Sequence, residues 1–197
     1  MTSSSSFFLQ RGSVPLRRPK QPYDENQLYD YAIGALARKM RSVAELKRLL
    51  RNRVSADESG KILVEMVILR LKEQKYLNDS GYAASYSAFR RDNEKFGARR
   101  VTTDLKMKGV HPDVIEQAVA QAYSGVDEEA QVRSFLKRKR LKQPANPREA
   151  GKVFRALMRA GFTSGIAVKV LKKWDVDDEL LTALQEEGSN EPDESAS

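Results

Sequence analysis

The feature that most constrains this chain is a short pattern that occurs three times. Each occurrence places a leucine five positions before a large apolar residue, in Leu49–Val54, Leu105–Val110 and Leu157–Phe162. The leucines are separated by 56 and then 52 residues. Spacings of this size are typical of arrays in which each unit buries part of its core on its neighbour. We therefore expect three similar units in tandem.

The residue just before the large apolar position predicts how a helix ends in each unit. Gly109 and Gly161 occupy that position in the second and third units. Glycine suits a left-handed turn at a helix end because it has no Cβ to clash. The first unit carries Arg53 there instead, so its turn departs from the pattern.

Apolar residues elsewhere recur at intervals of three and four, which is the period of an α-helix and not that of a strand. Three prolines, Pro112, Pro144 and Pro147, lie in the central part of the chain. The expected fold is all-α: a tandem array of three three-helix repeats, elongated and curved, with disordered termini.

The ends of the chain differ in charge from its middle. Residues 1–22 carry four basic residues and no acid, whereas nine acids and no Lys or Arg follow from residue 175. Such segments bury too little apolar surface to order themselves. The expected organisation is a disordered basic arm, three repeats and a disordered acidic tail, at residues 1–22, 23–77, 78–123, 124–180 and 181–197.

Local signals place several side chains. Ser42 and Glu45 have the spacing of a capping box at the start of a helix. Residues 62–71 are apolar at eight of ten positions, so we expect this helix to be the most buried. We expect four aromatic residues to pack in the core or to cover it, namely Tyr82, Tyr86, Phe89 and Trp174.

The composition excludes several functional classes. There is no cysteine and one histidine, His111, so the chain offers neither disulfides nor a zinc cluster. It has no glycine-rich phosphate loop, nucleophile elbow or pair of catalytic carboxylates. We expect no enzyme activity, no metal and no cofactor. No apolar run approaches the roughly 20 residues that span a bilayer, so we expect a cytoplasmic protein.

A formal net charge of +8 favours a polyanion or an acidic protein surface as the partner. Residues 124–174 are the most basic part, with thirteen basic and four acidic residues. The candidate contact residues form two clusters: Arg90, Arg91, Lys95, Arg99 and Arg100, and Lys137, Arg138, Lys139 and Arg140. The second cluster could equally be a solvated helix end whose cations complement the helix dipole.

Four segments in the middle of the chain resemble the central signature of the RecX recombination regulators. They are Leu71–Asp79, Gly81–Ala83, Phe96–Val101 and Asp104–Val110. The resemblance extends over about residues 27–174 and is most specific in the middle third. Lys75 stands where glycine is common in the family.

This resemblance implies a modular helical protein that binds the RecA recombinase in the groove of its filament on DNA. It also implies inhibition of the RecA ATPase, strand exchange and coprotease activities, and so negative regulation of homologous recombination and the SOS response. The expected partners are RecA and DNA, the latter weakly or only in the filament, with no membrane and no small-molecule substrate.

Two other interpretations remain open from the residues alone. Short helices joined by glycine turns also resemble helix-turn-helix units, which would make the chain a DNA-binding protein without a recombinase partner. A helical-repeat adaptor for another acidic protein is the second alternative. Binding to bare DNA at two salt concentrations, beside an assay of RecA ATPase, separates the three.

Overall fold

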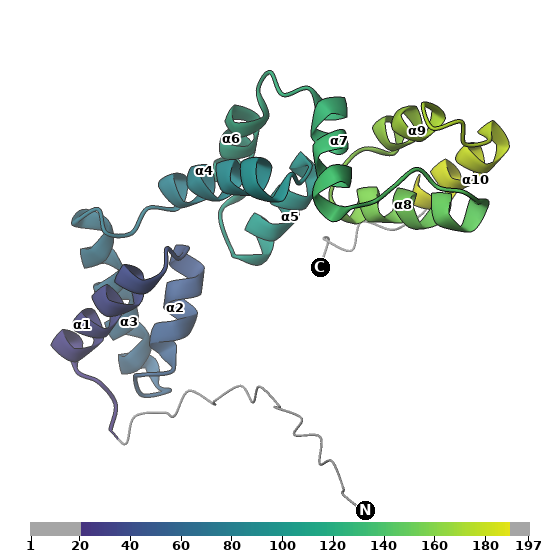
Figure 1. The fold of residues 1–197 in the computed structure, drawn as a ribbon. Helices are drawn as coiled ribbons and strands as arrows, with labels where there is room; N and C mark the ends of the chain where they lie inside the picture. Colours follow the sequence, from purple (N-terminus) through teal and green to yellow (C-terminus); the bar gives the residue numbers. More distant parts are fainter. Residues whose placement is uncertain (1–20, 190–197) are drawn as a thin grey trace, which may run out of the picture.

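The structure is a computed structural model that describes residues 21–189. Within that range it contains ten α-helices, one π-helical turn and no strand. Figure 1 shows the helices in three groups that follow one another along an elongated molecule. The all-α array is therefore confirmed. The expectations for residues 1–20 and 190–197 lie outside the described residues.

Repeat 1 consists of α1 (Glu25–Arg38), α2 (Val43–Arg51) and α3 (Glu58–Glu73). The capping box predicted at the start of α2 is present. The Glu45 N–H donates to Ser42 Oγ at 3.0 Å, and the Ser42 N–H donates to the Glu45 carboxylate at 3.2 Å. Both donors would otherwise lack a partner at the helix start.

The expectation that residues 62–71 form the most buried helix is wrong. One face of α3 packs in the core of repeat 1, but Ile62, Met66 and Leu69 on the opposite face are 54, 49 and 59 % exposed. These positions are four and three residues apart, so they form one stripe along the helix. A three-helix unit is too small to surround any of its helices, and α3 is therefore apolar on a face that nothing covers among the described residues.

Repeat 2 consists of α4 (Asp79–Phe89), the π-helical turn η1 (Arg90–Glu94), α5 (Ala98–Met107) and α6 (Pro112–Tyr123). Tyr82 is buried and Tyr86 half-buried, as expected. The prediction that Phe89 packs in the core is wrong, since its side chain is 54 % exposed. Phe89 is the last residue of α4, where the α-helix gives way to the π-helical turn.

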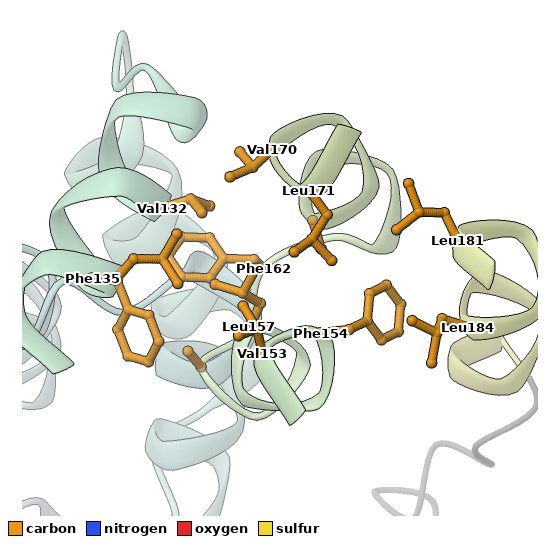
Figure 2. Close-up of a cluster of buried hydrophobic side chains, with 13 residues drawn as sticks. Val132, Phe135, Val153, Phe154, Leu157, Phe162, Val170, Leu171, Leu181 and Leu184 are labelled. Carbon is orange, nitrogen blue, oxygen red and sulfur yellow. The ribbon is translucent and has the colours of Figure 1, made fainter. Parts of the chain in front are cut away.

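Repeat 3 has one helix more than predicted. It consists of α7 (Glu128–Lys139), α8 (Pro147–Arg159), α9 (Ser164–Lys172) and α10 (Asp178–Ser189). The expected tail boundary at residue 181 is therefore wrong. Leu181 and Leu184 of α10 are 1 and 6 % exposed, and Figure 2 shows them facing Phe154 of α8. These two leucines provide enough apolar surface to hold an otherwise acidic helix on the repeat.

Two of the three helix-end turns have the left-handed backbone that the pattern predicts. Gly109 and Gly161 have left-handed backbones, with φ of 72° and 85°. The following residues donate back to the leucines of the pattern, Val110 N–H to Leu105 O and Phe162 N–H to Leu157 O, each at 3.2 Å. Arg53 does not have a positive φ, so the first turn is of a different kind, as its sequence indicated.

Each repeat has its own buried cluster of apolar side chains. Phe96, between η1 and α5, packs against the clusters of both repeat 2 and repeat 3. Its ring centroid lies 6.3 Å from that of Phe135 on α7. Figure 2 shows that Phe135 also faces Phe162. The partly buried Trp174 packs against the same cluster, as predicted. Phe96 thus ties two otherwise separate cores together.

The repeats are joined in the same way at both junctions. The residue that caps the second helix of one repeat contacts the turn that ends the second helix of the next. Ser42 Oγ donates to Lys108 O at 2.6 Å, and the Gly97 N–H donates to Ala160 O at 2.8 Å. Lys108 and Ala160 immediately precede the two left-handed glycines. Equivalent positions therefore meet at both junctions, through a side-chain hydroxyl at the first and a backbone N–H at the second.

Candidate interface for an anionic partner

Arg90 and Arg100, two of the predicted contact residues, are engaged inside repeat 2. Both pair with Asp104, which is 4 % exposed, at distances of 3.6 and 3.0 Å. The Tyr86 hydroxyl donates to the same carboxylate at 3.0 Å and accepts from Arg90 Nε at 2.9 Å. A buried carboxylate with this set of donors stabilises the fold, and its removal would leave two guanidinium groups unpaired.

The protonation of this network is fixed by its contacts. Burial opposes the charge of Arg90, but the hydrogen bond to Tyr86 and the charge of Asp104 raise its pKa overall. Burial also raises the pKa of the Tyr86 hydroxyl. The network therefore keeps a neutral phenol and a charged guanidinium across the physiological range.

Arg91 and Arg138 are engaged at the boundary between repeats 2 and 3. Arg91 pairs with Asp92, with Nε 2.7 Å from Oδ1, and its guanidinium also donates to the Ala122 carbonyl of α6. Arg138 of α7 pairs with Glu94 of η1 at 2.9 Å. The second pair brings the end of α7 beside η1, and so brings the two predicted clusters together.

The other five predicted cations have no ion pair among the described residues. We call this set the free cation surface: Lys95, Arg99, Lys137, Lys139 and Arg140. Lys95 adjoins Glu94, while Lys137 and Lys139 flank Arg138, so the Arg138–Glu94 pair holds them around one junction. All but the half-buried Lys95 are exposed. Successive residues of α7 turn by about 100°, so Lys137 and Lys139 point to different sides of the helix, and the five cations give positive charge around the junction and not one flat face.

The high charge of repeat 3 is partly neutralised within it. Glu129 of α7 is 9 % exposed and pairs with three cations, Arg133, Lys169 and Lys173. The hydrogen bond from Lys173 lowers the pKa of Glu129 to about 2, although burial opposes this. Lys169 and Lys173 thereby hold α9 against α7, while Arg133 pairs with Glu129 within α7 itself.

Sequence reasoning missed one candidate binding surface, a hollow of about 500 Å³ where repeats 1 and 2 meet. We call it the junction groove. It is lined by Arg41, Glu45, Arg48, Leu49, Asn52, Tyr86, Arg90, Asp104, Met107 and Lys108. These residues come from two separate segments of the chain, and no local pattern signals that the start of α2 meets the end of α5.

The described residues include no group of three or more His, Asp or Glu side chains that could hold a metal ion. None of the helices in residues 21–189 is long and apolar enough to cross a membrane.

The family comparison agrees with this architecture. A family model described as "RecX, second three-helix domain" matches residues 78–119, which cover α4, η1, α5 and most of α6. A regulatory protein RecX from Myxococcus xanthus is 33 % identical over 170 residues, or 79 % of this chain and 90 % of that protein. One from Pseudomonas putida is 30 % identical over 148 residues, or 75 % of this chain and 90 % of its own length.

Solved structures show the same fold. A crystal structure of RecX from Lactobacillus salivarius superposes with a TM-score of 0.61 at 20 % identity, covering 77 % of this chain and 96 % of that one. A second crystal structure of a regulatory protein RecX gives a TM-score of 0.62 at 21 % identity, covering 76 and 71 %. With relatives matched over nine tenths of their length, the chain belongs to the RecX family of regulatory proteins.

Proposed function

We propose that this protein is a negative regulator of homologous recombination and the SOS response. It binds the groove of the RecA filament on DNA and inhibits the ATPase, strand exchange and coprotease activities of RecA, without chemistry of its own. Since RecA filaments assemble on DNA in the cytoplasm, the protein acts there. Regulatory relatives of similar length support this role.

The observation that carries the proposal is the free cation surface at the junction of repeats 2 and 3. A filament groove is an extended surface with a repeating charge pattern, and a rigid array can contact several protomers at once. Many modest contacts on one body then add up to avidity without a deep pocket. Arg90, Arg91, Arg100 and Arg138 support this surface through their internal pairs, and the five free cations contact the partner.

The test is inhibition of DNA-dependent ATP hydrolysis by purified RecA. The variant Arg99→Glu/Lys137→Glu/Lys139→Glu should raise the concentration for half-maximal inhibition at least tenfold, because three attractive contacts become repulsive. A matched control reverses Lys39, Lys72 and Lys106, which are exposed and without ion pairs among the described residues. Equal inhibition by both variants would overturn the assignment of the surface.

The same assay decides between this role and its alternatives. A protein that only binds DNA would bind bare duplex with a steep dependence on salt and inhibit RecA in proportion to the DNA it covers. A protein that binds another acidic partner would leave RecA ATPase unchanged. Inhibition at concentrations well below that of RecA, under salt that prevents binding to bare DNA, supports the filament-directed role.

A further inference from the structure

We infer that the junction groove is a binding site for the phosphate groups of a single nucleic-acid strand. Four of the residues that line the groove are basic and two are acidic. Both acids are already neutralised from within the protein. Glu45 accepts from Lys108 Nζ at 3.0 Å and from the Tyr82 hydroxyl at 3.3 Å, and Asp104 is engaged as described above. The groove therefore keeps a net positive charge, which the cations not engaged by these two acids carry.

The charge of Glu45 is secured by these contacts. Burial raises the pKa of Glu45, but the hydrogen bonds from Lys108 and from the Ser42 N–H lower it more, so the net shift is downward. Lys108 is thus paired with Glu45, and Arg90 is paired with Asp104. Arg41 and Arg48 are left as the two cations of the groove that have no acidic partner among the described residues.

Arg41 carries a second signal. Its Nε is completely buried, yet no acceptor among the described residues bonds to it. A buried donor without an acceptor is unfavourable, so this guanidinium would gain from a small movement that lets an anion supply the missing oxygen. Arg48 uses Nε to hold Ala44 O at 3.3 Å, which fixes its side chain and leaves its two terminal nitrogens for a ligand. Guanidinium groups suit phosphate oxygens because their N–H donors match the geometry of the phosphate.

The surroundings favour a nucleic-acid strand over a free phosphate ion. Leu49 and the 63 % exposed Met107 give the groove an apolar wall that could cover a sugar or a base. Arg41 also lines a second hollow of about 260 Å³, together with Lys75 and the 60 % exposed Tyr76. A strand that passes Arg41 would meet another cation and an aromatic ring on the far side. Cations alternating with such surfaces are the usual equipment for binding single strands.

The experiment measures binding of a fluorescent oligothymidylate of about 15 nucleotides to the full chain by anisotropy, with no recombinase present. Arg48→Glu should weaken binding about tenfold, and Arg41→Ala about fivefold, because each removes a phosphate contact and lowers the salt slope by about one. Arg51→Glu is the matched control. It makes the same charge change on the same helix, exposed and outside the groove, and should change the affinity less than about twofold.

A second arm replaces the central phosphates of the oligonucleotide by uncharged methylphosphonates. The wild-type protein should bind this probe more weakly than the normal oligonucleotide. The Arg48→Glu variant should bind the two probes almost equally, since the substitution and the methylphosphonates remove the same contact. Equal weakening by Arg48→Glu and Arg51→Glu would overturn the inference. Displacement of the oligonucleotide by an equal concentration of inorganic pyrophosphate would also overturn it. Circular dichroism checks that the variants fold. If Arg41→Ala does not fold, Arg48→Glu still tests the inference, because Arg48 is exposed and its replacement should not disturb the core.

This inference stands apart from the proposed function. Oligonucleotide binding can fail while inhibition of RecA persists, which would reject the groove and keep the filament-directed role. Conversely, Arg48→Glu can lose its strand affinity while the variant of the free cation surface still inhibits RecA, which would keep the groove and reject the assigned filament surface.

Discussion

The carbonyl oxygen of Gly161 lies 2.3 Å from the position that a Cβ would take on Gly97. The reverse contact is equally close, since a Cβ on Gly161 would lie 2.2 Å from the backbone nitrogen of Arg100. With the Gly97 N–H bonded to Ala160 O at 2.8 Å, repeats 2 and 3 meet backbone against backbone. No side chain fits between them, so the angle between these repeats is set by main-chain atoms.

Gly97→Ala should therefore destabilise the protein by about 1–3 kcal/mol, because the added methyl group must push the two backbones apart. Urea unfolding followed by circular dichroism measures the loss. Gly165→Ala, at a helical position with no atom within 4 Å of the new Cβ, is the control and should stabilise by about 0.5–1 kcal/mol. Equal midpoints for the two variants would contradict the close contact.

The first of the three turns carries Arg53 where the other two carry glycine. The turns at Gly109 and Gly161 each receive the helix start of the preceding repeat, and a Cβ on Gly109 would lie 2.5 Å from the Cβ of Ala44. At the first turn the Tyr23 N–H donates to Arg53 O at 2.8 Å, and the φ of Arg53 is not positive. This position therefore does not need the left-handed backbone that favours glycine, and a residue with a Cβ can occupy it.

Four other helix ends carry a left-handed residue that is not glycine: Lys75, Lys95, Arg140 and Asp175. Lys75 has a φ of 61° at the end of α3. This backbone costs a residue with a Cβ roughly 1–2 kcal/mol more than glycine. Glycine loses more chain entropy on folding than lysine, which offsets part of this gain. The net effect of Lys75→Gly should be a stabilisation of about 0.5–1 kcal/mol.

Thermal unfolding measures this gain as a rise in Tm. Lys72→Gly, one turn earlier and inside the same helix, is the control and should cost about 1 kcal/mol because glycine disfavours a helix interior. A fall in Tm for Lys75→Gly would show that its side chain contributes more than the turn costs.

The helical repeats could be predicted from the sequence because each is defined by local signals, namely the capping box, the helix period and the turn glycines. The interface could be predicted only in part. The sequence shows that Arg90 and Arg100 belong to a cluster of basic residues. It does not show that both pair with Asp104 when α4 and α5 pack together. The alignment of Arg41 with Lys108 depends on a contact between two repeats, which no local pattern records.

The stripe on α3 shows a related limit. An apolar run predicts burial only if enough chain surrounds the helix, and the number of neighbours is a property of the assembled array. The buried Val67 and the exposed Met66 are adjacent in the sequence and equally apolar. Their difference arises from where α1 and α2 lie, which the run itself does not specify.

The Glu129 cluster predicts a dependence of stability on pH. Its folded-state pKa of about 2 lies below the ordinary value of 4.5. The stabilisation is therefore complete above about pH 4.5 and is lost as the pH falls toward 2, when the carboxylate takes up a proton and releases Lys169 and Lys173.

Urea unfolding of the wild type and of Glu129→Gln at several pH values measures this contribution. The wild type should be the more stable of the two at pH 6, and the difference should shrink as the pH approaches 2. A difference that stays constant over this window would mean that Glu129 acts through packing and not through its charge.

The leucines of α10 predict where the folded part of the chain ends. Leu181 is 1 % exposed and lies in the cluster of repeat 3, so Leu181→Ala should cost about 2–5 kcal/mol through lost burial and the cavity it leaves. Truncation after residue 180 should cost at least as much, whereas truncation after residue 189 should leave the free energy of unfolding nearly unchanged. If truncation after 180 is as stable as the full chain, α10 contributes nothing to repeat 3, and the acidic segment then begins where the sequence alone suggested.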